Sequence, residues 1–127
     1  MLRKIVVYVV GPYRSEIVDG IYQNIQEARR VAKELWRLGF TVICPHMNTA
    51  LLDGACDDSA WLEGDLEILK RCDAVCTVPG YQSSEGSRAE LKEAIRRNIA
   101  IFNSPKVVRD TFHHAGVKNY LSNIDRS

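Results

Sequence analysis

The stretch "RKIVVYVVGPYR", residues 3–14, decides the fold class of this 127-residue chain. Residues 3–10 form a nearly continuous apolar and β-branched run, which is typical of a strand buried on both faces of a parallel sheet. The Gly-Pro pair at 11–12 ends the run, which is too short and too β-branched to indicate a signal peptide. We therefore interpret it as the first strand of an α/β protein.

A helix and a second strand follow the loop at 11–20. Apolar residues recur at helical spacing from Ile21 to Leu38, and Gly39 has the place of a helix stop. Residues 40–44 predict a strand that Pro45 ends. Together these segments complete one βαβ unit, for which a right-handed crossover is expected.

The rest of the chain repeats this alternation. The further elements that we predict are a loop at 46–58 with at most one helical turn, a helix from Asp58 or Ser59 to about Cys72, a strand at 74–78, a helix to about Asn98 and a strand at 100–102. The order predicts one domain over 1–127, a three-layer Rossmann-like or flavodoxin-like fold. Its parallel sheet has four to five strands flanked by helices, and the tail after about 103 stays unassigned apart from a short helical pattern at 111–121.

Composition and net charge argue against a nucleic acid polymer or a membrane as the partner of this chain. Apolar residues make up 46% of the chain and charged residues 26%, as in ordinary globular proteins. The net charge of +1 provides no basic field for a nucleic acid polymer or a membrane, and no apolar stretch approaches the ~20 residues of a membrane span. The four cysteines lack paired CxxC spacing, so we expect reduced thiols, a cytoplasmic location and neither metal nor cofactor.

Three loops, at 11–20, 45–58 and 79–87, are expected to meet where ligands bind in such sheets. In the third, small polar residues precede a helix whose free N–H groups and dipole favour an anion. These residues are Ser83, Ser84, Gly86 and Ser87. Plain N-capping by Ser84 or Ser87 explains one serine but not the whole cluster.

Glu90 follows about one turn into that helix, where the dipole helps to keep a carboxylate ionised. An ionised carboxylate can serve as a nucleophile, although a glutamate on a helix is more commonly a solvated surface acid. Asp65 shares a helical stripe with Trp61 and Leu69, so it either lines a cleft or faces water at the edge of the stripe. Tyr8 lies in the buried strand, where its hydroxyl needs either a carboxylate or a backbone partner.

The other two loops carry weaker signals. Gly11 permits close approach of the backbone to a ligand, and Arg14 can bind a phosphate through two nitrogens. A plain turn with a solvated arginine is the simpler interpretation of this loop. His46 and Asn48 can contact a base or a sugar, or have no role at all.

Taken in order, four segments resemble the nucleoside 2-deoxyribosyltransferase-like superfamily, and its small bacterial and phage members most. That superfamily includes deoxyribosyltransferases and nucleoside 5′-monophosphate N-glycosidases. The segments are "VYVVGPYR" (7–14), "NIQEARRVAKELWRLGFTVICPH" (24–46), "GDLEILKRCDAV" (64–75) and "SEGSRAELKEA" (84–94). They cover most of the first hundred residues.

The resemblance implies a role for each matching residue. Glu90 takes the place of the nucleophile, Asp65 that of the acid/base and Tyr8 that of the tyrosine that orients the nucleophile. The implied phosphate contacts are Ser84 and Arg14. The further substrate-binding candidates are Gly11, Tyr13, His46, Gly86 and Ser87. Two features depart from the family: Lys92 stands where a glycine is common, and the carboxamide that transferases borrow from a neighbouring subunit has no counterpart.

The expected function is cleavage or transfer at the N-glycosidic bond of a nucleoside or nucleoside 5′-monophosphate, by a homo-oligomer without a cofactor. Of the two acids, we expect Asp65 to hold the proton and Glu90 the negative charge. A non-catalytic nucleotide-binding or sensor module on the same fold is the alternative, and a structural subunit is a third. The base, the sugar and the choice between hydrolysis and transfer stay open.

Overall fold

The computed structural model describes residues 4–49, 52 and 54–112. In chain order the elements are β1 (Val6–Val10), α1 (Val18–Arg37), β2 (Thr41–Ile43), α2 (Pro45–Asn48), α3 (Asp58–Leu69), β3 (Ala74–Thr77), the 3-10 turn η1 (Tyr81–Ser83), α4 (Glu85–Arg96), β4 (Ala100–Phe102) and α5 (Pro105–Asp110). The described residues contain no helix long and apolar enough to cross a bilayer.

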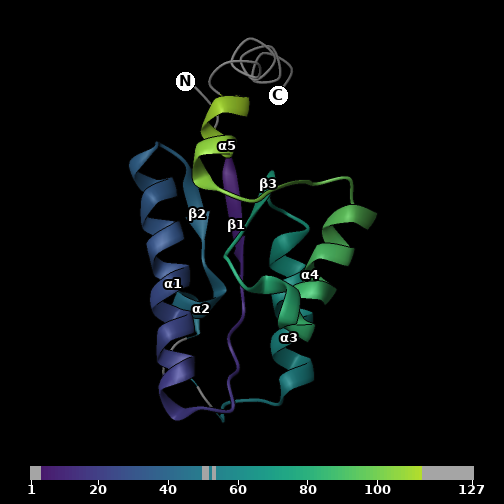
Figure 1. Cartoon of the computed structure of the whole chain (residues 1–127). Coiled ribbons are helices and arrows are strands. Elements are labelled where there is room, and N and C mark those ends of the chain that lie inside the picture. The colour runs from purple at the N-terminus through teal and green to yellow at the C-terminus, as the bar shows by residue number, and fades with distance from the viewer. Residues whose placement is uncertain (1–3, 50–51, 53, 113–127) are drawn as a thin grey trace.

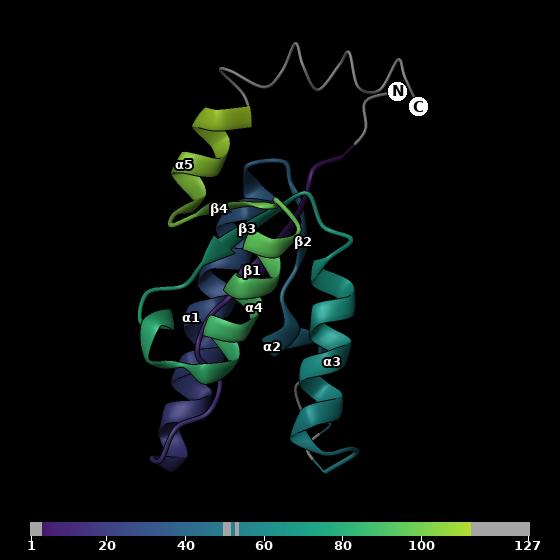
Figure 2. The same cartoon turned by 90° about the vertical axis from the view of Figure 1, so that its right-hand side faces the viewer.

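The four strands form one parallel sheet in the order β2-β1-β3-β4, which confirms the predicted α/β class (Figures 1 and 2). The chain leaves β1 toward β2 on one side and later returns to β3 on the other side. The topological switch point of the sheet therefore lies between the neighbouring strands β1 and β3. In such folds, ligands bind beyond the carboxyl ends of these strands.

Helices cover both faces of the sheet (Figures 1 and 2). Each face carries a separate apolar cluster. On one face, Val7 and Val9 pack with Leu35 of α1 and Val108 of α5. On the other face, Tyr8 and its neighbours pack with Leu69, the last residue of α3, and with Ala94 of α4. The alternation along β1 explains why its sequence is apolar at almost every position, because both of its faces are buried.

Several boundaries differ from the prediction. Asp57, rather than Asp58 or Ser59, caps α3, because its carboxylate accepts the N–H of Ala60 at 3.0 Å. Helix α4 begins at Glu85, inside the segment predicted as loop. The tail carries a helix that composition did not suggest, α5, whose first turn is capped by Ser104. Most of the helical pattern at 111–121 falls outside the described residues.

Candidate active site

A cavity of about 860 Å³ lies at the carboxyl ends of β1 and β3. Most of the predicted site residues line it, from the loop after β1, from α2, from α3 and from the start of α4, whereas Tyr8 and Asn48 do not. These lining residues are Gly11, Tyr13, Arg14, His46, Asp65, Ser84, Gly86, Ser87 and Glu90. The three loops thus converge as the parallel topology predicts.

Tyr8 lies beneath the cavity, fully buried in the central strand β1. Its hydroxyl donates a hydrogen bond to Oε2 of Glu90, which α4 presents from above the same face of the sheet. Burial, followed by the nearby charges of Glu90 and Asp65, raises the pKa of the Tyr8 hydroxyl, so it stays a donor at neutral pH. The tyrosine therefore fixes the position of one carboxylate oxygen.

The two acids of the site hold the proton in the opposite order to the one expected. Burial raises the pKa of Glu90 to about 8; the charge of Asp65 raises it as well, while the hydrogen bond from Tyr8 lowers it. Burial alone raises the pKa of the half-buried Asp65, to about 6. Glu90 is the sixth residue of α4, beyond the first turn where the helix dipole is strong, so burial outweighs the dipole. Near neutral pH Glu90 therefore binds a proton more tightly than Asp65 does.

Arg14 is an exposed cation that already has a partner. Its guanidinium forms an ion pair with the exposed carboxylate of Asp58 and joins the loop after β1 to the first turn of α3. Asn24 of α1 supports the same loop, because its side-chain amide donates to the carbonyl of Tyr13 at 3.1 Å. The sequence did not suggest Asp58 as a neighbour of the phosphate-binding candidate.

His46 is buried and contacts the loop after β1. Its Nε2 lies 2.7 Å from the carbonyl oxygen of Pro12, and its ring meets that of Tyr13 edge-on at 5.4 Å. Burial lowers the pKa of His46, so the ring is neutral near pH 7 and Nε2 carries the donated hydrogen. Asn48, the other candidate of this loop, does not line the cavity and lies in a separate groove.

Two serines at the start of α4 differ in their hydrogen bonding: Ser84 caps the helix, and Ser87 has a hydroxyl without a hydrogen-bond partner among the described residues. Ser84 caps the helix by accepting the N–H of Ser87 at 3.1 Å, as the simpler alternative proposed, and its own O–H remains a donor. The hydroxyl of Ser87 is buried and has no hydrogen-bond partner among the described residues. Such an unsatisfied buried hydroxyl is uncommon in native proteins and suits a site that a ligand completes.

Gly11 is required by packing, whether or not a ligand approaches it. A Cβ at this position would lie 2.7 Å from Cβ of Val78, at the end of β3. The close approach of two strand ends is therefore sufficient to explain a glycine here, and a ligand contact at Gly11 stays a prediction.

Two residues of α3 that were not predicted as site residues, Trp61 and Leu62, form part of the cavity wall. Trp61 and Leu62 are half-buried there, although their spacing predicted only an apolar helix face for packing. The available signal was the position of Asp65 four residues after Trp61, which puts an acid and an indole on one stripe. No group of three or more potential metal ligands occurs within the described ranges.

Among the solved structures that are similar to this chain are the following two. One is a 2-deoxyribosyltransferase from the psychrotolerant bacterium Bacillus psychrosaccharolyticus, with a TM-score of 0.58 and 19% identity over 76% of this chain and 69% of that one. The other is a conserved protein from Enterococcus faecalis V583, with a TM-score of 0.63 and 17% identity over 78% of this chain and 62% of that one. At such identities the likeness shows the shared α/β fold.

A search of curated proteins gives no match. A sequence family does match, over residues 5–104, which span every strand and helices α1 to α4. The matched range also contains each residue that lines the cavity. The chain belongs to this family, described as a domain of unknown function, DUF7768.

Proposed function

We propose that the protein cleaves or transfers at the N-glycosidic bond of a nucleoside 5′-monophosphate. The observation that carries this function is the buried hydrogen bond from Tyr8 to Glu90, beside Asp65 in the same cavity. Two carboxyl groups in one pocket, one ionised and one protonated, are what retaining glycosidases use. The likeness to a structure named a 2-deoxyribosyltransferase supports the same class of chemistry.

The single proton of the acid pair is sufficient for the reaction. When substrate enters, the proton moves from Glu90 to Asp65, so that Glu90 becomes an ionised nucleophile held by Tyr8. A Glu90 oxygen then bonds to C1′ as the bond from C1′ to the base nitrogen breaks, and Asp65 gives its proton to the departing base. Asp65, now a carboxylate, takes a proton from the water or acceptor hydroxyl that attacks C1′, and Glu90 leaves as a carboxylate.

The turn before α4 supplies the phosphate contacts. The O–H groups of Ser84 and Ser87 and the free N–H groups of the first helical turn lie at the edge of the cavity. Arg14 lines the same cavity and adds a positive charge once its guanidinium is shared with the ligand. A 5′-phosphate here leaves the sugar near Glu90, since both groups project from the same helix.

A binding module without catalysis would use the same phosphate contacts. The acid pair favours the enzyme, because burying Glu90 beside a second acid is unfavourable for folding and contributes nothing to holding a phosphate. A functional reason is therefore needed for keeping both carboxyl groups in the cavity.

The test is to incubate the purified chain with a panel of nucleosides and their 5′-monophosphates and to measure free base by chromatography. We expect base release from the wild type and none from Glu90→Gln, which keeps an acceptor for the Tyr8 hydroxyl. We expect Asp65→Asn to lose activity on natural bases but to retain it on a nitrophenyl analogue, whose leaving group needs no proton. Monophosphate binding by the wild type without any base release would instead establish the binding module.

A further inference from the structure

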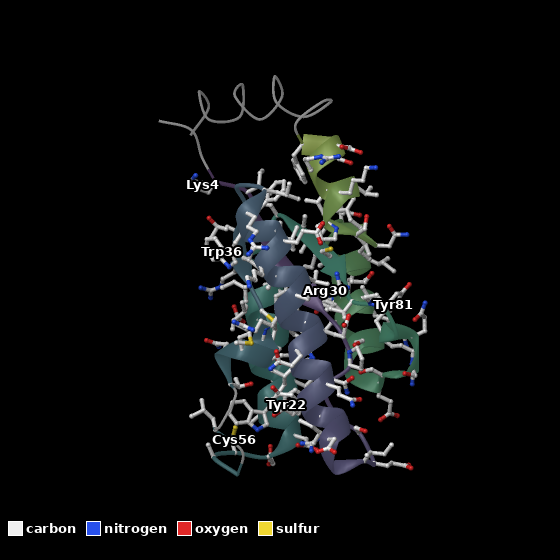
Figure 3. The ribbon with its side chains drawn as sticks, turned by 60° about the vertical axis from the view of Figure 1, so that its left-hand side comes forward. Lys4, Tyr22, Arg30, Trp36, Cys56 and Tyr81 are labelled. Atoms are coloured by element: carbon white, nitrogen blue, oxygen red, sulfur yellow. The ribbon has the colours of Figure 1, made fainter. Side chains whose placement is uncertain are left out.

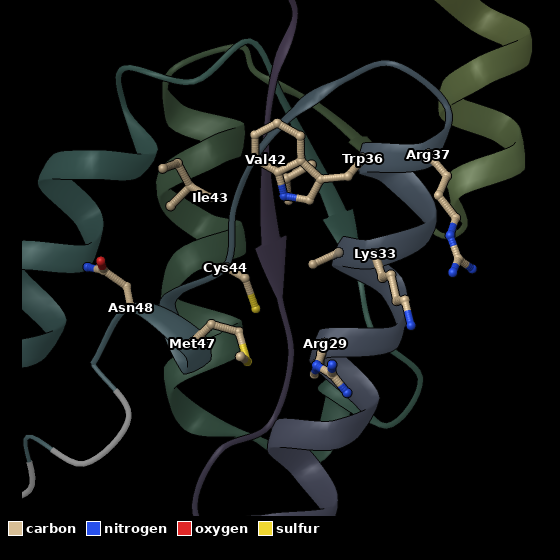
Figure 4. A pocket seen from close by; sticks show the side chains of 10 residues that line it. Arg29, Lys33, Trp36, Arg37, Val42, Ile43, Cys44, Met47 and Asn48 are labelled. Atoms are coloured by element: carbon tan, nitrogen blue, oxygen red, sulfur yellow. The ribbon is translucent and has the colours of Figure 1, made fainter.

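A second hollow, of about 530 Å³, lies between α1 and the edge strand β2, continuing to α2 (Figure 4). It shares no lining residue with the candidate active site. More than half of its lining residues are exposed, so it is a groove that is open along its length. We call it the α1–β2 groove.

Three cations follow one side of the α1–β2 groove. Arg29, Lys33 and Arg37 are spaced four residues apart, so they lie along one face of α1 (Figure 4). All three are exposed, and none has an ion pair or hydrogen bond from its side chain to another described residue. By contrast, each of the other arginines in the described ranges has an acid or a carbonyl as partner.

Like charges at this spacing destabilise a helix by roughly 0.2–0.5 kcal/mol per pair. An isolated chain gains nothing from that repulsion, whereas a bound anion would offset it. The paired arginines elsewhere show that this protein otherwise places acids beside its guanidinium groups.

An apolar strip lies beside the cations. Trp36 is 54% exposed and Met47 is 45% exposed, and Figure 4 shows Met47 and Cys44 projecting toward the α1 side chains. Figure 3 shows Trp36 at the outer surface of the molecule. Buried Val42 of the edge strand lies beside the indole. A bound partner that covers this strip removes apolar surface from water.

We propose that the α1–β2 groove binds an extended acidic segment of a partner protein, with its carboxylates on Arg29, Lys33 and Arg37 and one large apolar side chain between Trp36 and Met47. An open groove beside an edge strand fits an extended chain. Charge complementarity selects an acidic one.

A nucleic acid fits this surface less well. Three cations on a chain of net charge +1 are fewer than the phosphate contacts that sustain binding at physiological salt. A membrane surface also fits less well, because the apolar residues line a hollow rather than project from a convex face.

The experiment selects peptides from a displayed random library on the purified full chain. We expect enrichment of sequences that combine several Asp or Glu residues with one large apolar residue. A synthetic selected peptide is then titrated calorimetrically against the wild type, the double variant Arg29→Gln with Lys33→Gln, and a matched control, Lys4→Gln with Lys106→Gln. The control removes two exposed positive charges that line neither hollow.

Binding should be about tenfold weaker for the groove variant, from two lost exposed charge contacts, and unchanged for the control. Peptides selected on Trp36→Ala should keep their acidic residues and lose the preference for a large apolar one. No enrichment of acidic residues, or equal weakening in both double variants, overturns the assignment. Tighter binding of oligodeoxythymidylate or phosphatidylserine vesicles than of any selected peptide, abolished by the groove variant, also overturns it.

Discussion

At the scale of single residues, the molecule keeps a titratable pair where an apolar core would be more stable. Glu90 is 7% exposed and packs above a fully buried tyrosine. Burial raises the pKa of Glu90 to about 8 and that of Asp65 to about 6. Because the two groups interact, these values belong to the pair, which carries one proton across the interval between them.

The protonation of this pair predicts a bell-shaped pH profile for base release. Below about pH 6 both groups hold a proton, so no carboxylate can attack C1′. Above about pH 8 both are ionised, so no proton reaches the leaving base. We therefore expect kcat/KM to be highest near pH 7, with one limb on each side.

Asp65→Asn provides the control. Because this variant lacks the second titratable group, its pH profile on the nitrophenyl analogue should have a single limb. A wild-type rate on natural bases that keeps rising well above pH 8 contradicts the requirement for a shared proton.

At the scale of elements, the loop after β1 is held from three directions. His46 of α2 contacts the Pro12 carbonyl, Asn24 of α1 holds the Tyr13 carbonyl, and Asp58 of α3 pairs with Arg14. The loop is thus positioned before any ligand arrives, and only the last of these contacts is exposed enough to be exchanged for a phosphate.

If Arg14 exchanges Asp58 for a phosphate, removing the charge of Arg14 and removing that of Asp58 should have opposite effects on monophosphate binding. Arg14→Ala should weaken monophosphate binding by about ten- to a hundredfold, since charged hydrogen bonds contribute roughly 1.5–3 kcal/mol. Asp58→Asn should strengthen it, because the guanidinium no longer has a competing carboxylate. Calorimetric titration with a nucleoside 5′-monophosphate measures both effects. If the two variants bind with wild-type affinity, the ion pair serves only to fasten the loop to α3.

The elements and the site were predictable to different degrees. The pattern of β1 and the periodicity of α1 suffice for the α/β class, because each is fixed locally by burial on two faces or on one. The meeting of Tyr8 with Glu90 followed from the resemblance, and the spacing of 82 residues gives no local signal for it. The ion pair of Arg14 with Asp58 depends on where the fold places the loop after β1 beside α3, and the raised pKa of Glu90 depends on tertiary burial. No local pattern encodes either.

At the scale of the whole molecule, the sheet has two edges, and β4 is the more exposed one. Ile95 of α4 is 66% exposed and Ile101 of β4 is 38% exposed. Unpaired strand edges with apolar neighbours are common places for association between copies.

A homo-oligomer, at least a dimer, therefore stays a prediction for the protein in solution. Sedimentation velocity at micromolar concentration measures the state directly. We expect Ile95→Lys with Ile101→Lys to shift the protein toward monomer, while the exposed but distant Tyr22→Lys leaves the distribution unchanged. A wild-type monomer across the accessible concentrations contradicts the prediction.

The acid pair also predicts how the stability of the whole fold depends on pH. The pKa of Glu90 rises from the ordinary 4.5 to about 8 on folding, so the folded state binds its proton more tightly than the unfolded state. The resulting stabilisation is fully present below pH 4.5 and is lost as pH rises through 8. The loss is on the order of 5 kcal/mol, a large part of the free energy of unfolding of a small domain.

Glu90→Gln removes that titration while retaining a partner for the Tyr8 hydroxyl. We therefore expect the Tm of the variant to exceed that of the wild type by a margin that grows between pH 5 and pH 8, reaching about 10 °C. Taking the difference cancels the titrating groups that do not interact with Glu90, among them His46, whose lowered pKa acts in the opposite direction. Glu63→Gln, which neutralises an exposed acid of α3, should follow the wild type throughout. A margin that stays constant with pH would show that Glu90 is already ionised in the folded protein, and the proton of the site would then have to reside on Asp65.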